Sequence, residues 1–279
     1  RDVIDTANQE NLPKITTGHG IIASAYTLNV EKILQKSGRQ LKKERIAYLD
    51  VSSLGLSTLR LILHCLPHPE EILLCDMYNR FEVLEEIRHE ISEKFEFQGN
   101  IRVMGLHPEI PSELYEATMI VCPTNVPDIL NINHVKAGTI CIGTTCFSAK
   151  SLLTRFERQG DILFTVGGVL QLPEPVVDLA YRPHSMSGYL NSAVLENFNS
   201  KGNAHDIPSC TLSSLLCSQF EQVLPSVGLV EHDIALQQYE LLKKLRCQGV
   251  ELHTGSYVLP EETIKNFREK FNIDFHGHN

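Results

Sequence analysis

Residues 45–63 read Arg45-Ile-Ala-Tyr-Leu-Asp-Val-Ser-Ser-Leu-Gly-Leu-Ser-Thr-Leu-Arg-Leu-Ile-Leu63. Residues 46–49 are apolar and predict a short buried strand, and the small residues 51–55 predict a tight turn. The leucines from Leu56 onward predict an amphipathic helix. A strand, a tight turn and a helix in this order open a β-α-β unit, the place where doubly wound folds bind a dinucleotide. The stretch therefore predicts an α/β, Rossmann-like doubly wound fold with a mostly parallel sheet and an added C-terminal helical region.

The turn departs from G-x-G-x-x-G, the glycine-rich fingerprint of dinucleotide sites. Only Gly55 is present, and Asp50 occupies a position where a glycine is expected. A carboxylate there would repel a diphosphate unless a cation or the helix N-terminus offsets its charge. The sequence of this turn therefore predicts the Rossmann-like fold more strongly than it predicts a cofactor-binding site. We expect NADPH or NADH to contact Ser52, Ser53 and Gly55.

A second predicted strand, residues 71–76, ends in Asp76. In dinucleotide sites an acidic residue about 20 positions beyond the glycine-rich turn binds the ribose hydroxyls, and Asp76 falls at that distance. Arg80 could instead meet a 2′-phosphate. The alternative is that Asp76 only caps the helix that the apolar spacing predicts over residues 81–94.

Further apolar segments predict strands at residues 101–104, 118–122, 139–142 and 161–165. Small or polar residues follow the last three of them. Because ligands of open parallel sheets bind just outside the carboxyl ends of the strands, these residues are expected to converge around a nicotinamide. They are Thr124, Asn125, Gly143, Thr144, Gly167 and Gly168.

The segment Thr16-Thr-Gly-His-Gly20 precedes a predicted helix that reaches about Leu34. It is either an ordinary N-cap region or part of a site, since its N–H groups and hydroxyls would point at an anion or a carbonyl. Thr17, Gly18 and His19 are therefore the candidates for substrate binding. We divide the chain into an N-terminal segment and helix (1–38), a Rossmann-like dinucleotide-binding domain (39–170) and a C-terminal helical region (171–279). In the last region helices are predicted over 209–222, 232–248 and 260–271.

These landmarks together resemble the cyanobacterial long-chain acyl-[acyl-carrier-protein] reductases, which form aldehydes. The resemblance is distant and runs from about Thr16 to about Leu252. It covers the Thr16–Tyr26 segment, the strand, turn and helix of residues 46–63, and residues 72–80. It also covers Gly167-Gly-Val169, Ser226-Val-Gly228 and Ser209-Cys-Thr-Leu-Ser-Ser-Leu-Leu216, which resembles the helix whose cysteine carries the acyl group in that family.

The resemblance implies an oxidoreductase that reduces an acyl thioester, or a related carbonyl, to an aldehyde with NADPH or NADH. Cys210 is implied as the nucleophile that forms a Cys-bound acyl intermediate. A helix N-terminus favours the thiolate form of a cysteine, and Cys210 lies at a predicted helix start. The alternative for Cys210 is a buried structural cysteine, the role we expect for Cys217. Ser213 and Ser214 stand where the family carries Glu and Ala.

Two other functions stay open. A dehydrogenase of the shikimate or glutamyl-tRNA reductase type would need a Lys-Asp pair or a different catalytic Cys, and Lys150 is the one lysine near the predicted strand ends. A non-catalytic Rossmann-like binding or scaffold domain of a larger biosynthetic protein is favoured by Asp50. It is also favoured by a chain that begins at Arg1 rather than Met, which we expect to be trimmed from something longer.

Composition excludes several functional classes. The 279 residues are 42% hydrophobic and 21% charged, and the formal net charge of −9 argues against general nucleic-acid binding. No apolar run approaches the roughly 18 residues that a membrane span needs. The eight cysteines form no C-x-x-C pair, which suits a reducing cytoplasm. His64, His68 and His107 are dispersed, so no metal is expected. The expected partner is a small-molecule or carrier-bound acyl substrate, and a homo-oligomer stays open.

Overall fold

The computed structural model describes residues 15–106, 110–124, 126, 129–143, 157–158, 160–176, 203–254 and 257–272. The first part of the chain forms α2 (His19–Ser37), η1 (Leu41–Lys43), β1 (Arg45–Leu49), α3 (Ser53–Cys65), β2 (Glu71–Asp76), α4 (Phe81–Lys94), β3 (Asn100–Gly105), α5 (Ser112–Tyr115), β4 (Met119–Cys122), β5 (Ile140–Gly143) and β6 (Leu163–Thr165). The second part forms β7 (Val169–Gln171), β8 (Asp206–Pro208), α8 (Ser209–Gln219), α9 (His232–Lys244), β9 (Gln248–Gly249), β10 (His253–Thr254), β11 (Tyr257–Val258) and α10 (Glu261–Phe271).

Six strands form one sheet in the order β3-β2-β1-β4-β5-β6, and every pair is parallel. The order reverses direction between β1 and β4, which makes the carboxyl ends of these two strands the topological switch point of the sheet. This is the strand order of the doubly wound dinucleotide-binding fold. The predicted α/β, Rossmann-like fold with a mostly parallel sheet and added C-terminal helices is therefore confirmed.

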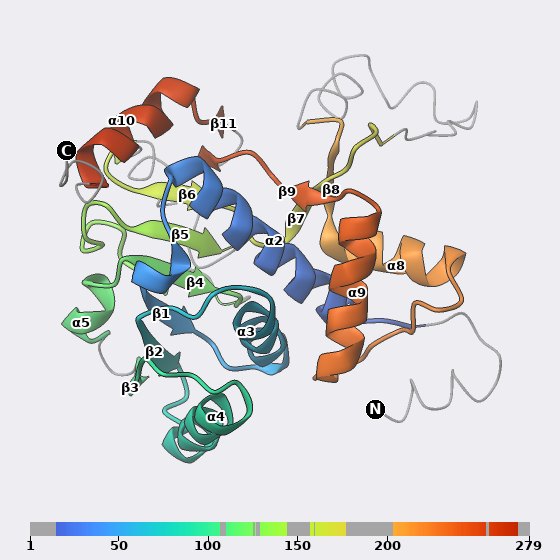
Figure 1. Cartoon of the computed structure of the whole chain (residues 1–279), viewed down its shortest axis with the longest axis horizontal. Coiled ribbons are helices and arrows are strands. Elements are labelled where there is room, and N and C mark those ends of the chain that lie inside the picture. The colour runs from blue at the N-terminus through green and yellow to red at the C-terminus, as the bar shows by residue number, and fades with distance from the viewer. Residues whose placement is uncertain are drawn as a thin grey trace, which may run out of the picture.

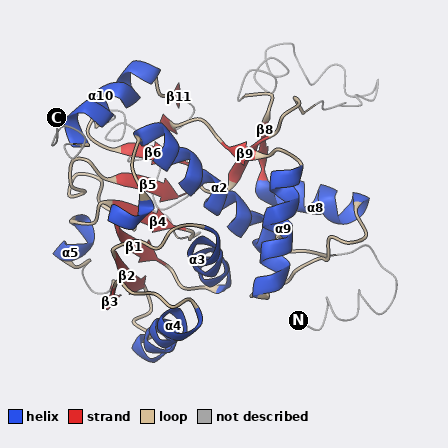
Figure 2. Cartoon of the chain, viewed as in Figure 1, coloured by secondary structure: helices blue, strands red, loops and turns tan. Residues whose placement is uncertain are grey.

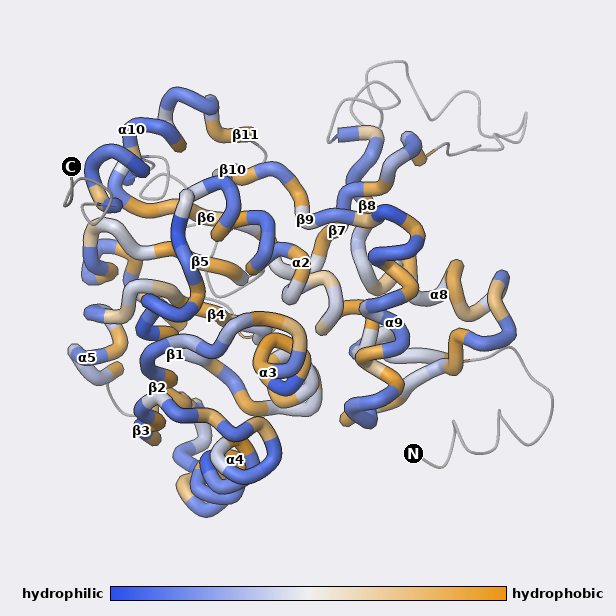
Figure 3. Tube along the Cα trace, viewed as in Figure 1, coloured by the Kyte–Doolittle hydropathy of each residue, from blue (hydrophilic) through white to orange (hydrophobic). Residues whose placement is uncertain are grey.

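The strands at the centre of the sheet are buried on both faces, as their continuous apolar sequences predict. Along β1, Ile46 and Tyr48 point into one core and Ala47 and Leu49 into the other. Helices α2, α3, α4 and α10 cover the first face, and α5 with residues 129–135 covers the second. Figure 2 shows the strands stacked between these helices. Helix α10 keeps only Ile264 and Phe267 buried and is largely hydrophilic in Figure 3.

Helix α2 joins the sheet to the C-terminal helices. Its residues Tyr26 and Ile33 belong to the core on the sheet. Ile21 and Leu28 belong to a third core, which α8 and α9 share. In Figure 1 the helix lies between the sheet on one side and α8 and α9 on the other. Because α2 packs on both sides, it is buried along most of its length, and its buried residues include Ser24, Thr27 and Asn29.

The region after β6 contains structure that the sequence did not predict. Strands β7, β8 and β9 form a small antiparallel sheet in the order β8-β7-β9. Each has only two or three residues, which is too short for a period-2 pattern to be visible. No helix in the described part of the chain is both long enough and apolar enough to span a membrane.

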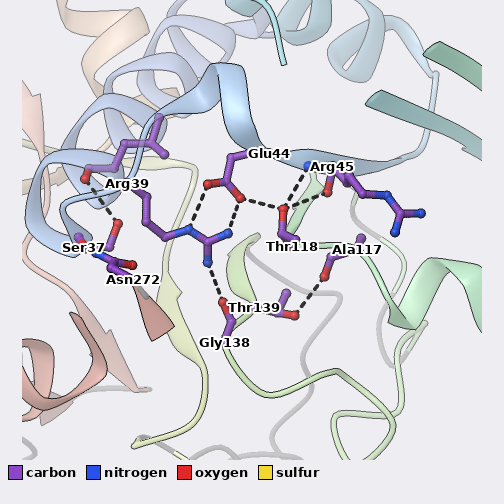
Figure 4. Close-up of polar contacts among 10 residues, drawn as sticks. Ser37, Arg39, Glu44, Arg45, Ala117, Thr118, Gly138, Thr139 and Asn272 are labelled. Atoms are coloured by element: carbon purple, nitrogen blue, oxygen red, sulfur yellow. Dashed lines mark hydrogen bonds and ion pairs between the residues drawn. The ribbon is translucent and has the colours of Figure 1, made fainter. Parts of the chain in front are cut away.

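A buried polar cluster ties together the amino ends of β1, β4 and β5 (Figure 4). Glu44 is 1% exposed and accepts hydrogen bonds from the Arg39 guanidinium and, at 2.6 Å, from Thr118 Oγ1. Arg39 also donates to the carbonyl of Gly138. The cluster lies at the opposite end of the strands from the switch point, so it supports the sheet rather than the site.

Candidate functional site

The turn between β1 and α3 keeps the spacing of a dinucleotide fingerprint with two substitutions. Asp50, Ser52 and Gly55 occupy the three glycine positions. Asp50 adopts φ 81°, a left-handed conformation that favours glycine. At Gly55 a Cβ would lie 2.0 Å from the carbonyl oxygen of Asp50, so the close approach of helix to strand requires glycine there, as at the third position of the fingerprint.

The carboxylate of Asp50 turns toward the start of α3. Its Oδ1 accepts a hydrogen bond from the backbone N–H of Ser52 at 2.7 Å, and its Oδ2 accepts one from Ser52 Oγ at 3.1 Å. Ser52 is the N-cap residue of α3. The helix N-terminus that would face a pyrophosphate therefore already holds an anion supplied by the chain.

At the end of β2, Asp76 is almost fully buried and pairs with Arg80. The guanidinium of Arg80 donates to both carboxylate oxygens, at 2.6 and 3.1 Å, and the backbone N–H groups of Tyr78 and Arg80 donate at 3.1 and 3.0 Å. Burial would raise the pKa of Asp76, but the hydrogen bonds from Arg80 outweigh it and lower the pKa. Asp76 thus supports the turn before α4, and a ribose would have to compete with Arg80 for it.

Two other predicted strand-end residues, Thr124 and Gly143, are buried. Thr124 follows β4, is buried and accepts a hydrogen bond from the N–H of Val126 at 3.2 Å. Gly143 is the last residue of β5 and is buried. Asn125, Thr144 and Lys150 lie outside the described residues.

Gly167 and Gly168 contact helix α2 and the start of α8. A Cβ on Gly167 would lie 2.0 Å from the ring of Tyr26, and the Tyr26 hydroxyl donates to the carbonyl of Cys122 at 3.3 Å. The carbonyl of Gly168 accepts the N–H and the hydroxyl of Ser209, at 3.0 and 2.7 Å. This turn therefore positions α2 and the start of α8.

Two segments on which the family resemblance rests meet in space. The N–H and the hydroxyl of Thr17 donate to the carbonyl of Ser226, at 2.7 and 3.0 Å. In return the N–H of Ser226 donates to Thr16 Oγ1 at 3.2 Å. Their separation in the chain is about 210 residues. The segment before α2 is consequently fixed at the edge of the C-terminal region.

Cys210 is the second residue of α8 and is exposed. Gly18 packs directly against this part of the helix, since a Cβ on Gly18 would lie 3.1 Å from Ser213 Cβ and 3.5 Å from Cys210 Cα. Cys217 is buried in the core that α8 shares with α2 and α9. The structure therefore brings Cys210, the predicted nucleophile, beside Gly18, one of the three predicted substrate-binding residues. Thr17 and His19 instead contact Ser226 and Gly228.

His19 connects the segment before α2 to the turn between β1 and α3. Its Nδ1 lies 2.7 Å from the carbonyl oxygen of Gly228 and 3.3 Å from Ser53 Oγ. His19 and Ser53 are the first residues of α2 and α3. The starts of three helices, α2, α3 and α8, thus lie together next to the switch point of the sheet.

Asn29 is a positioning residue that the sequence did not single out. Its Nδ2 donates to the carbonyls of Gly167 and Val169, at 3.1 and 2.8 Å, and its Oδ1 accepts the N–H of Val250 at 2.9 Å. Asn29 is buried, and a buried amide needs several partners. Among the described residues no three His, Cys, Asp or Glu side chains gather as a metal site would require.

Comparisons with known proteins add little to this geometry. No protein-family model and no curated protein matches the chain. The NADH and L-proline complex of Thermococcus litoralis Δ1-pyrroline-2-carboxylate reductase is 18% identical over 43% of this chain, with a TM-score of 0.32. E. coli MccB is 14% identical over 67% of this chain, with a TM-score of 0.29. The matches span 35% and 55% of those proteins' own lengths. Such weak likenesses carry no argument about function, so the fold assignment rests on the strand order of the sheet.

Proposed function

We propose that the chain is an NAD(P)H-dependent oxidoreductase that reduces an acyl thioester through a Cys210-bound acyl group. One observation carries the proposal: an exposed cysteine at the start of α8 lies against Gly18, and the next residue, His19, contacts the start of α3 at the switch point. A nucleophile and a cofactor crevice would have to adjoin in this way for an acyl group on sulfur to be reduced.

At the carboxyl ends of β1 and β2, two features favour dinucleotide binding and one opposes it. Gly55 permits the close helix approach, and the half-exposed Arg80 stands at the end of β2, where it could meet a 2′-phosphate. The carboxylate of Asp50 opposes a diphosphate at α3 and would have to rotate away. Ser52, Ser53 and Gly55 would then hold the cofactor. A reduced nicotinamide supplies a hydride when it is bound.

The chain's own chemistry is acyl transfer. The thiolate of Cys210 attacks the thioester carbonyl carbon, a new carbon–sulfur bond forms, and the bond to the departing thiol breaks. The departing thiolate takes up from solvent one proton, equal to the proton that the Cys210 thiol released to solvent on ionising, so charge and atoms balance. The acyl group then remains on Cys210, whose surroundings are the N–H groups at the start of α8 and the segment before α2.

The test has two parts. Calorimetric titration with NADPH and NADH measures cofactor binding, and intact-protein mass spectrometry after incubation with an acyl-coenzyme A measures acyl transfer. We expect saturable binding and a single acyl adduct on the peptide that contains Cys210. The variant Cys210→Ser should lose thioester formation, whereas Cys65→Ser, a half-buried cysteine at the end of α3, should keep it. Equal labelling of the two variants would refute Cys210 as the nucleophile.

A second candidate is a non-catalytic binding or scaffold domain. The observation that favours it is the Asp50 carboxylate at the start of α3, which fills the place of a phosphate. Absence of binding at millimolar NADPH and NADH would favour this candidate over the oxidoreductase.

A further inference from the structure

Two histidine rings meet where the end of α3 packs on the start of α9. His232 Nε2 lies 3.1 Å from His64 Nδ1, and the two ring centroids are 4.8 Å apart. His232 is the first residue of α9 and is half-buried, with the ring of Phe95 edge-on to it. His64 belongs to the last turn of α3 and is exposed. Such a contact is a hydrogen bond only if one of the two nitrogens carries a proton and the other does not.

The surroundings of the pair decide which nitrogen donates. His232 Nδ1 is buried and has no hydrogen-bond partner among the described residues. A proton there would be a buried N–H group without an acceptor, which folded proteins avoid. The proton of His232 therefore sits on Nε2 and is donated to the lone pair of His64 Nδ1. The hydrogen bond thus forms when both rings are neutral.

The charges around the pair do not favour a positive charge on His232. Arg60 of α3 and Glu90 of α4 face it, but they already form an ion pair of 2.7 Å with each other. The remaining charged group that faces it is Asp233, which is exposed. Burial lowers the pKa of His232, and the neighbouring His64 lowers it further. A helix start disfavours a cation and a helix end favours one, so acid adds the first proton at His64, on Nδ1.

We propose that the His64–His232 hydrogen bond is an acid-sensitive contact that holds the loop of residues 226–231 against α3. Protonation of Nδ1 changes His64 from an acceptor into a donor, so that two N–H groups face each other. The bond could form again only if the proton of His232 moved to its buried Nδ1, where no described residue accepts it. The rings therefore separate as the pH falls below about 6.5, the ordinary pKa of histidine.

This loop also holds the segment before α2. The carbonyls of Ser226 and Gly228 accept hydrogen bonds from Thr17 and His19. His19 can donate through Nδ1 whether its ring is neutral or charged, so acid does not break that bond. Loss of the contact at His232 consequently frees the end of the loop that leads into α9, and the segment before α2 becomes less firmly held. The device needs neither Cys210 nor a bound cofactor, so it is independent of the proposed function.

The test is hydrogen–deuterium exchange of the full chain, read by mass spectrometry on peptides that cover residues 224–235. Rates at about pH 8 and about pH 5 are divided by the intrinsic rates, since histidines titrate in this interval while Asp and Glu stay largely ionised. We expect the loop amides of the parent to exchange at least about fivefold faster at the lower pH, a factor that corresponds to the loss of one hydrogen bond. His64→Asn keeps an acceptor near the place of Nδ1 but takes up no proton, so its loop should be equally protected at both pH values.

The matched control is His89→Asn, which removes an exposed histidine of α4 and should keep the pH dependence of the parent. The proposal is overturned if His64→Asn shows the same pH dependence as the parent, or if the protection of the parent does not change. A second measurement is the long-range proton–nitrogen spectrum of the imidazole rings at about pH 8, where both histidines are neutral. It should show His232 protonated on Nε2, and a proton on Nδ1 would also overturn the proposal.

Discussion

The Asp50 carboxylate and the backbone N–H of Ser52 form a hydrogen bond of 2.7 Å at the start of α3. In a doubly wound sheet the amides at this helix start receive the pyrophosphate of a dinucleotide. Here one of these amides already donates to the carboxylate of Asp50, a residue whose backbone has φ 81°. A dinucleotide bound in this way would compete with the Asp50 side chain for one position, and its affinity would depend on the outcome.

Asp50→Gly should strengthen NADPH binding. The substitution removes the competing charge, and glycine adopts the left-handed conformation without strain. A charge at a helix terminus is worth roughly 1–2 kcal/mol in a partly buried site, or about five- to thirty-fold in affinity. Calorimetric titration measures the change.

Asp50→Asn is the matched control, because asparagine tolerates the left-handed conformation and can still accept from Ser52 but carries no charge. It should bind NADPH with an affinity between those of the parent and Asp50→Gly. The gain should also shrink at high salt, since salt screens charge repulsion. If Asp50→Gly binds no more tightly than the parent at low salt, the carboxylate does not limit cofactor binding.

Gly55→Ala should destabilise the fold. The new Cβ would lie 2.0 Å from the carbonyl oxygen of Asp50, so the β1–α3 turn must move. Overpacking of this kind costs about 1–3 kcal/mol of unfolding free energy, which urea denaturation followed by circular dichroism can resolve. Gly160→Ala is the control, because nothing lies within 4 Å of a Cβ there. Equal stability of the two variants would contradict the close packing at Gly55.

The sheet could be predicted from the sequence because each buried strand is a short apolar run bounded by small or polar residues. The start of α8 at Ser209 was also visible, since a helical period begins there after a proline. The contacts of Asp50 and Gly167 could not be predicted in this way. The first depends on a side-chain rotamer, and the second depends on the ring of Tyr26, which packs there from a helix far away in the chain.

The contact between Cys210 and Gly18 also could not be predicted from the hydrophobic periodicity of the sequence. Sequence placed both residues in candidate roles, but their contact depends on how α2 packs on α8 through the core that they share. The positive φ of 71° at Gly18 and its close approach to Ser213 are features of the tertiary structure. The local sequence pattern therefore predicts the helices that carry this site, but it does not predict which of their residues come into contact.

Glu44→Gln should lower stability without affecting the switch point. Glu44 is almost fully buried and pairs with Arg39, so its loss leaves a guanidinium in a low-dielectric region without its counter-charge. Removing one partner of a buried pair costs about 3–5 kcal/mol. Thermal and urea unfolding should both report it. Glu269→Gln, from an exposed pair with Lys265, should stay within about 0.5 kcal/mol of the parent. If Glu44→Gln unfolds like the parent, the cluster contributes little to the sheet.

Asp76 should make the fold sensitive to acid. Its folded-state pKa is lowered, because the hydrogen bonds from Arg80 outweigh its burial. A carboxyl group whose pKa is lowered on folding stabilises the fold above its unfolded pKa, which is about 3.9 for Asp. This contribution is lost as the pH falls through the lower folded value. Urea unfolding at intervals between pH 7 and pH 2.5 should therefore show a loss below about pH 4 in the parent. In Asp76→Asn, which is less stable at neutral pH, this part of the curve should be flatter. Parallel curves for the two proteins would mean that Arg80, whose side chain is 42% exposed, is too well solvated to hold the carboxylate.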